Sequence, residues 1–173
     1  MALKSLPQWL TVISKNSAEP IFQPEKYFNK STTWAQLRDR TSGKSSLQQL
    51  QVINEFWNKW KYIDDRANWG MADYWAYPAQ FLKKSGDCED YAIVKYFTLK
   101  ELGFDPHLMR IVVLKNTFTG EGHAVLAVYM NNDVYILDNL SPVVLSHKRI
   151  GQYEPQYSVN EFQRWQHIPP KSN

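Results

Sequence analysis

The sequence of 173 residues contains a single cysteine, Cys88, so a disulfide within the chain is excluded. It also has no excess of charge of one sign. The 20 basic and 17 acidic residues give a net charge of +3, and no basic run is present, which argues against nucleic acid as a partner. No stretch reaches the roughly 18 apolar residues of a membrane-spanning helix, and the first ten residues lack the apolar region of a signal peptide. We therefore expect one domain without a membrane span, with 43% hydrophobic residues to build a core.

The chain as a whole, 1–173, is predicted to form one domain, with a helical lead-in lobe at residues 1–61 and a core at residues 62–173. The start of the lobe is expected to be irregular or only briefly helical, because three prolines interrupt it: Pro7, Pro20 and Pro24. Residues 45–61 favour an amphipathic helix. Apolar side chains recur there at spacings of three and four, and thus share one face: Leu47, Leu50, Ile53, Trp57 and Trp60.

Residues 88–102 favour a further helix, which is apolar on several sides and is ended by Gly103. Asp87 is a candidate N-cap, which places Cys88 at the first helical position. The unpaired backbone N–H groups and the positive end of the helix dipole favour a thiolate there. Cys88 is therefore a candidate nucleophile, although a lone cysteine is more often a small buried apolar residue.

Three carboxylates surround this cysteine: Asp87, Glu89 and Asp90. Their negative charges raise the pKa of the thiol and so oppose the effect of the helix terminus. A bound hard cation would offset them, because carboxylate oxygens are the ligands that calcium prefers. The spacing is not that of an EF-hand loop, and the same acids would suit the first turn of a helix as solvated residues. The residues alone leave both interpretations open.

From Pro106 onward the pattern changes to short strands, with candidates at residues 107–114, 123–130 and 134–138. Asn131 and Asn132 tolerate positive φ and predict a tight hairpin between the second and third of these strands. If these two residues form the turn, Met130 pairs with Asp133. The same register places Asp138 opposite Val125.

This register brings Asp138 diagonally across from His123, because side chains two residues apart share a face of the sheet. A diagonal backbone separation of roughly 7–8 Å can be bridged by long side chains. Cys88, His123 and Asp138 then supply the nucleophile, the base and the orienting carboxylate of a thiol-dependent acyl transfer. The sequence has three other histidines, His107, His147 and His167. None of them sits on a predicted strand that has a partner acid in matching register.

Five runs of the sequence resemble the bacterial transglutaminase-like cysteine proteinases: residues 73–78, 86–93, 95–97, 122–126 and 137–140. The resemblance spans roughly residues 50–165 in the expected order, and Asp-Cys-Glu-Asp-Tyr at residues 87–91 is its most specific part. The family usually has methionine after the histidine, where this chain has Ala124.

The resemblance implies an α+β fold with a papain-like, transglutaminase-like core, in which N-terminal helices and a central cysteine helix pack on an antiparallel sheet. It implies a catalytic triad of Cys88, His123 and Asp138. It also implies calcium as cofactor, bound by the acids that flank the cysteine, with Asp87 and Glu89 the first candidate ligands and Asp90 the next.

The activity that the resemblance implies is endoproteolysis, at small residues, in the N-terminal region of a large cell-surface adhesin, which controls attachment in biofilms. The implied location is the periplasm. The implied partner, besides the adhesin, is an inner-membrane cyclic-di-GMP receptor that sequesters the protease.

Two other functions stay open at this point. A transglutaminase or amidase would use the same core and the same thioester, and only the acceptor would differ. A non-enzymatic, calcium-dependent binding module would keep the fold without the chemistry, but the presence of all three candidate catalytic residues argues against it.

Overall fold

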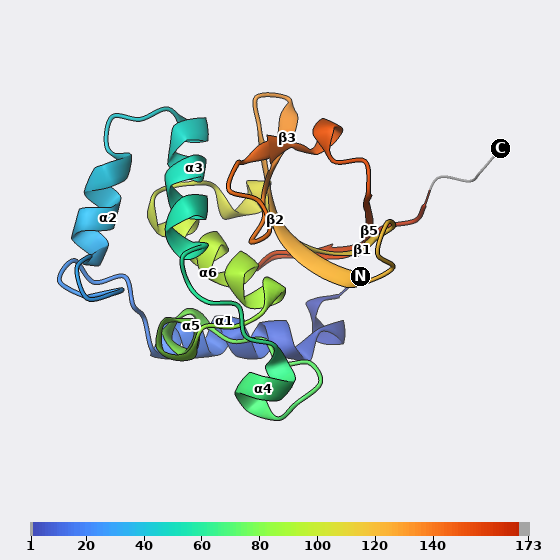
Figure 1. Cartoon of the computed structure of the whole chain (residues 1–173), viewed down its shortest axis with the longest axis horizontal. Coiled ribbons are helices and arrows are strands. Elements are labelled where there is room, and N and C mark those ends of the chain that lie inside the picture. The colour runs from blue at the N-terminus through green and yellow to red at the C-terminus, as the bar shows by residue number, and fades with distance from the viewer. Residues whose placement is uncertain (1, 170–173) are drawn as a thin grey trace.

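The computed structural model describes residues 2–169 as a layer of helices packed on one six-stranded antiparallel sheet (Figure 1). The helices are α1 (Pro7–Ala18), α2 (Trp34–Thr41), α3 (Ser46–Trp57), α4 (Asp65–Trp69), α5 (Pro78–Lys84) and α6 (Cys88–Glu101), with short 3-10 helices η1 (Leu3–Ser5), η2 (Pro106–Leu108) and η3 (His147–Arg149). The strands are β1 (Met109–Asn116), β2 (Gly122–Met130), β3 (Asp133–Leu137), β4 (Leu145–Ser146), β5 (Tyr153–Val159) and β6 (Arg164–Gln166), in the spatial order β4-β3-β2-β1-β5-β6. This arrangement confirms the predicted α+β class.

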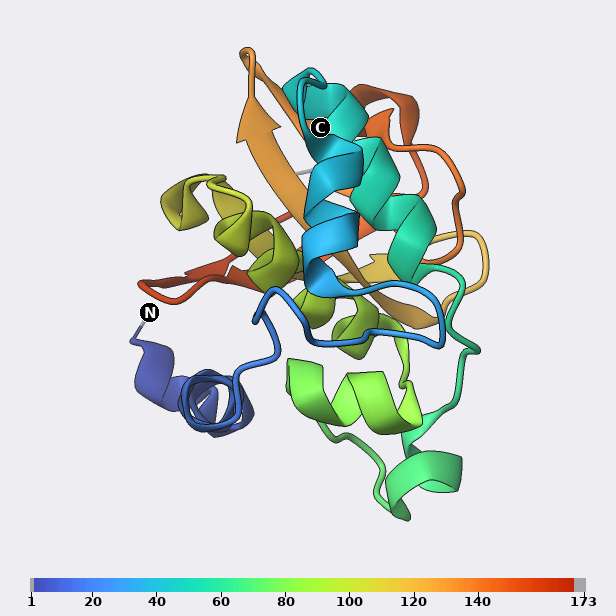
Figure 2. The ribbon, with the colours of Figure 1, turned by 90° about the vertical axis from the view of Figure 1, so that its left-hand side faces the viewer.

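The predicted amphipathic helix is α3, and Ser45 is its N-cap. The Ser45 side chain accepts a hydrogen bond from the Gln48 N–H, and the Gln48 side chain accepts one from the Ser45 N–H, which satisfies two donors at the helix start. The helix lies beside α2 in front of the sheet (Figure 2). It ends at Trp57, earlier than predicted.

The expectation that the start of the chain is at most briefly helical is wrong at α1, which has 12 residues. Pro7 begins this helix instead of interrupting it, because the first turn needs no proline N–H and the fixed φ of proline suits a helix. Trp9 and Val12 on α1 are fully buried in the core. None of the described helices has the length and apolar character needed to cross a bilayer.

Helix α6 is the central element. It contacts β1 and β2 on one side and α3 and α5 on others, and its residues from Asp90 to Leu99 are all buried. This burial on several sides explains why its sequence shows no single apolar face. The predicted packing of a central cysteine helix on the sheet is therefore confirmed.

The β2–β3 hairpin has the predicted register. Asn131 and Asn132 adopt φ of 54° and 56°, and Met130 pairs with Asp133. Alternate residues of β2 face opposite sides of the sheet, so one side packs on α6 and the other carries a second, smaller apolar cluster. His123, near the start of β2, lies at the end of this second side.

Candidate active site

Cys88 is the first residue of α6 and Asp87 is its N-cap, as predicted. The Asp87 N–H donates to Asp90 Oδ2 at 3.1 Å, which fixes the chain where the helix begins. The thiol is partly buried and lies 3.1 Å from Glu89 Oε2. Burial, then the charges of Glu89 and Asp87, raise the pKa of the Cys88 thiol well above its usual range. Burial has the largest effect, and the carboxylates act in the direction that the sequence indicated, against the thiolate.

His123 and Asp138 form a buried pair. His123 Nε2 lies 2.8 Å from Asp138 Oδ1, and the two residues are 8% and 4% exposed. Asp138 follows β3 directly, so the hairpin register delivers its carboxylate to the histidine ring. Because Nε2 contacts the carboxylate, Nδ1 is the ring nitrogen left for another partner.

Two further donors hold the Asp138 carboxylate. The Tyr153 hydroxyl donates to Oδ2 at 2.6 Å, and the Leu140 N–H donates to Oδ1 at 2.9 Å. Burial alone would raise the pKa of Asp138, but the bonds from His123, Tyr153 and Leu140 outweigh it, and the pKa lies below its ordinary value. Asp138 is therefore an ionised acceptor at neutral pH, and Tyr153 is a neighbour that sequence reasoning did not find.

The thiol contacts the main chain next to this pair. The N–H of Ala124, the residue after His123, lies beside Cys88 Sγ and lowers its pKa against the larger opposing effects. The His123 and Tyr153 rings are 5.5 Å apart. The fold thus gathers Cys88, His123 and Asp138, which are distant in sequence, at one place.

The other three histidines have different surroundings. His107 stacks on Phe162 with 3.7 Å between ring centroids. His147 lies 3.6 Å from Asp133, with half of its side chain exposed, and His167 contacts the Ser158 hydroxyl at 2.8 Å. Among the described residues, His123 is thus the histidine that contacts a buried carboxylate.

Two groups of possible cation ligands have Asp87 in common. One comprises Asp87, Cys88 and Glu89, the other Asp65, Asp87 and Asp90, and in each group the ligand atoms lie within 4.8 Å of one another. Asp65 was not among the predicted ligands. The Ile63 N–H donates to the Gly86 carbonyl at 3.0 Å and so aligns the segment before α4 with the start of α6. This contact is tertiary, and no spacing in the sequence reveals it.

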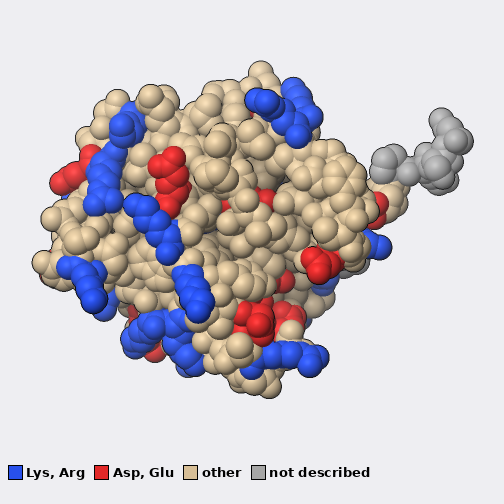
Figure 3. Space-filling view, viewed as in Figure 1, with Lys and Arg blue, Asp and Glu red and all other residues tan. Residues whose placement is uncertain are grey.

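Burial and mutual repulsion raise the pKa of Asp65, Asp87 and Asp90 in this cluster. Burial, then the charges of Glu89, Asp90 and Asp65, raise the pKa of Asp87 to about 10. Burial likewise raises the pKa of Asp90 well above its ordinary value. Acidic side chains gather near α4 on the face shown in Figure 3.

The donor set fits calcium. Asp65 Oδ1 and Asp87 Oδ1 are buried and have no hydrogen-bond partner within residues 2–169. Carboxylate oxygens without a proton donor are ligands for a hard cation. The two oxygens of Asp90 are already engaged, since they accept the Ala76 N–H at 2.7 Å and the Asp87 N–H at 3.1 Å.

Gly86 leaves room for the Asp90 side chain, and this close approach gives a stability prediction. A Cβ at residue 86 would lie 2.1 Å from Asp90 Oδ2 and 2.6 Å from Asp90 Cβ. We expect Gly86→Ala to lower the free energy of unfolding by about 1–3 kcal/mol. Each kcal/mol corresponds to a fall in Tm of about 2–4 °C for a chain of this length. Thermal unfolding in excess chelator measures this. Gly151→Ala is the matched control, because a Cβ there meets nothing within 4 Å. Equal Tm values for the two variants would contradict the prediction.

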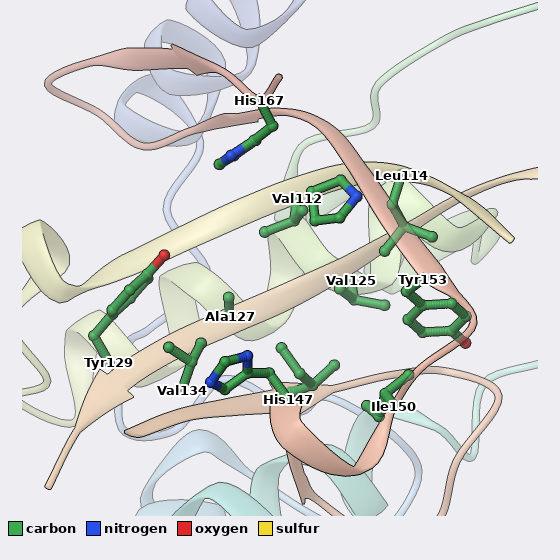
Figure 4. A pocket seen from close by; sticks show the side chains of 12 residues that line it. Val112, Leu114, Val125, Ala127, Tyr129, Val134, His147, Ile150, Tyr153 and His167 are labelled. Carbon is green, nitrogen blue, oxygen red and sulfur yellow. The ribbon is translucent and has the colours of Figure 1, made fainter. Parts of the chain in front are cut away.

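An apolar pocket of about 450 Å³ lies inside the curve of the sheet, on the side away from α6 (Figure 4). Valine, leucine, isoleucine and alanine side chains from β1, β2 and β3 line it, with Tyr129 and Tyr153 at opposite ends. The ring of Tyr153 is a wall of this pocket while its hydroxyl holds Asp138. Tyr153 therefore connects this pocket with the His123–Asp138 pair.

Comparison with known proteins places this site in a family. The family model of the bacterial transglutaminase-like cysteine proteinases matches residues 25–173. A structure of Legionella pneumophila LapG is 33% identical over 77% of this chain and 75% of that chain, with a TM-score of 0.69. A calcium-bound structure of Legionella pneumophila LapG is 28% identical over 91% of this chain and 86% of that chain, with a TM-score of 0.71.

Comparison with curated proteins gives no match. The family match nevertheless covers most of the chain, and the two solved structures match its fold over 77% and 91% of its length. The chain belongs to the bacterial transglutaminase-like cysteine proteinases.

Proposed function

We propose that the protein is a calcium-dependent cysteine endopeptidase with Cys88, His123 and Asp138 as its catalytic triad. One observation carries the proposal: the chain's sole thiol lies against the start of β2, where His123 and Asp138 form a buried bond of 2.8 Å. A nucleophile, a base and an orienting acid in this arrangement are the parts that thiol-dependent acyl transfer requires. Membership of a cysteine proteinase family supports the same chemistry.

The mechanism follows from the three positions. The Cys88 thiol gives its proton to His123 Nδ1, and the thiolate attacks the peptide carbonyl carbon. The backbone N–H of Cys88 has no acceptor within the helix, so it is available to the oxyanion that forms. The C–N bond breaks as the imidazolium protonates the leaving amine. Water, deprotonated by His123, then hydrolyses the thioester and releases the thiol. Asp138 keeps the proton of the neutral ring on Nε2 throughout.

The acids at the start of α6 would hold calcium, with Asp87 and Glu89 as the first ligands and Asp65 and Asp90 beside them. When bound, calcium supplies positive charge that offsets the carboxylates around the thiol. Asp90 meanwhile ties the Ala76 and Asp87 main chains together, which fixes the loop that precedes Cys88. Similarity to a calcium-bound LapG structure supports this assignment.

The proposed substrate is the N-terminal region of a large cell-surface adhesin, cut at small residues in the periplasm, so that cleavage controls attachment in biofilms. The proposed regulator is an inner-membrane cyclic-di-GMP receptor that sequesters the protease. The resemblance of the motifs around Cys88, His123 and Asp138 to those of the family supports these assignments.

The test is incubation with the N-terminal fragment of a candidate adhesin, with calcium or with chelator, followed by intact mass measurement. We expect two fragments whose masses sum to that of the substrate plus one water, in calcium only, and none with Cys88→Ala. Incorporation of a labelled amine without hydrolysis would replace this proposal with a transglutaminase. Calcium-dependent binding that survives alkylation of Cys88, without any cleavage, would replace it with a binding module.

A further inference from the structure

Helix α6 carries a fully buried lysine two turns beyond the candidate nucleophile. Lys95 has 0% exposure, although lysine is almost never fully buried unless it is paired. Its ammonium group donates to Asn54 Oδ1 at 2.9 Å and to Asn58 Oδ1 at 2.7 Å. Both partners belong to the end of α3, Asn54 inside the helix and Asn58 at its C-cap. The catalytic steps described above do not use this cluster.

The two asparagines also donate hydrogen bonds to the turn that follows β3. The Asn58 amide donates to the Asp138 carbonyl at 2.9 Å and to the Ser141 carbonyl at 3.1 Å. The Asn54 amide donates to the same Ser141 carbonyl at 3.0 Å. In this turn the Leu140 N–H donates to Asp138 Oδ1, the oxygen that also contacts His123. The cluster is therefore connected to the candidate acid through its main chain.

Lys95 decides how the two amides are oriented. An asparagine side chain can exchange its oxygen and nitrogen by rotation, and a lysine ammonium can only donate. Asn54 and Asn58 must therefore turn their oxygens toward Lys95, which directs both NH₂ groups to the carbonyls of the turn. Burial lowers the pKa of Lys95 to about 7, against the opposing effect of the Asp138 charge. The ammonium has three protons and the neutral amine two, so either form can donate to both asparagine oxygens.

We propose that Lys95 is a positioning residue: by orienting Asn54 and Asn58 it fixes the turn at residues 138–141, and so holds Asp138 where it orients His123. The inference rests on the proposed function for its effect on turnover, and on geometry alone for its effect on the His123–Asp138 contact. The same contacts also join the helix that carries the nucleophile to the loop that carries the acid.

The experiment compares Lys95→Met, Asn58→Leu and the double variant, in full-length protein with calcium. Each single variant should lower kcat by roughly 10- to 100-fold with little change in KM, since a displaced catalytic group of this kind costs up to about 100-fold in rate. The double variant should be no worse than the poorer single variant, because both changes release the same turn. NMR of the ring N–H proton shared by His123 and Asp138, assigned by its loss in His123→Ala, should show a weakened bond in all three variants.

Thr98→Val is the matched control. Thr98 is one turn further along α6, and its hydroxyl oxygen accepts a hydrogen bond from the indole N–H of Trp57 at 3.0 Å. The change therefore removes a buried hydrogen bond from the same α3–α6 interface without touching the 138–141 turn. It should lower Tm and leave kcat and the ring signal unchanged. If wild-type protein cuts no substrate, the proposed function fails while the ring signal still decides the positioning role. If Lys95→Met does not fold, the Asn58→Leu variant tests the positioning role instead, because Asn58 is only half-buried. A folded variant with an intact ring signal and full kcat overturns the inference.

Discussion

Cys88→Ala is expected to lower kcat by roughly 10⁵-fold or more, because loss of a nucleophile removes the covalent pathway and leaves only binding and oxyanion stabilisation. Tm is not expected to fall. The thiol lies among carboxylates whose charges disfavour its ionised form, and its Sγ lies 3.1 Å from Glu89 Oε2. Cleavage of an adhesin fragment and thermal unfolding, measured on the same preparation, test both parts.

Two variants of the buried pair accompany this measurement. His123→Ala should reduce turnover to a similar extent, since the thiol then has no base. Asp138→Asn keeps the shape but offers an amide to a ring nitrogen that must donate, so the ring is held in the wrong tautomer and kcat should fall by up to about 10⁴-fold. Turnover that persists at the wild-type rate in folded Cys88→Ala protein would remove the thioester mechanism, and with it the roles assigned to His123 and Asp138.

The contact between His123 and Asp138 could be predicted because one local feature fixed the register of their strands. Two asparagines that tolerate positive φ set the β2–β3 hairpin, and the period of two along each strand then placed Asp138 near His123. The position of Cys88 at a helix start followed in the same way from a capping residue and a run of apolar side chains. Both inferences depend on residues close together in sequence.

Asp65, Tyr153 and Lys95 could not be found in this way. Each joins the site through a contact between distant segments: Ile63 with Gly86, Tyr153 with Asp138, and Lys95 with Asn58. Their residue types are also ambiguous. Asp65 is the first residue of a short helix, where an acid suits the helix start. A lysine within an apolar helix suggests a side chain that reaches solvent, whereas Lys95 is fully buried. Only the packing of α3 and α6 reveals its role.

Calcium is expected to raise Tm and to be required for cleavage. The folded chain gathers carboxylates that the unfolded chain does not, so calcium binds the folded state preferentially. At a calcium concentration of about 100 times Kd, binding raises the free energy of unfolding by about 2.7 kcal/mol. This corresponds to a rise in Tm of roughly 5–10 °C for a protein of this size. Melting curves and cleavage rates across a calcium titration of protein verified as metal-free provide the measurement.

The gain in Tm from calcium should increase with pH. Burial and neighbouring charges raise the folded pKa of Asp87 from 3.8 to about 10. In metal-free protein its contribution to stability is therefore present below about pH 4 and is lost as the pH rises toward about 10. Calcium competes with the proton that Asp87 holds in this window, so the gain in Tm from calcium should be larger at pH 8 than at pH 5.

Substitution of the ligands separates calcium binding from a general effect of salt. Asp87→Ala and Glu89→Ala should lose most of the calcium response while the thiol still reacts with an alkylating reagent. Glu121→Gln, at an exposed position in the β1–β2 turn, should respond as wild type does. Magnesium should substitute poorly, because it demands a tighter octahedral shell than clustered side chains give. If neither Tm nor cleavage changes with calcium or chelator, the acids beside Cys88 serve only to cap the start of α6 and bind no cation.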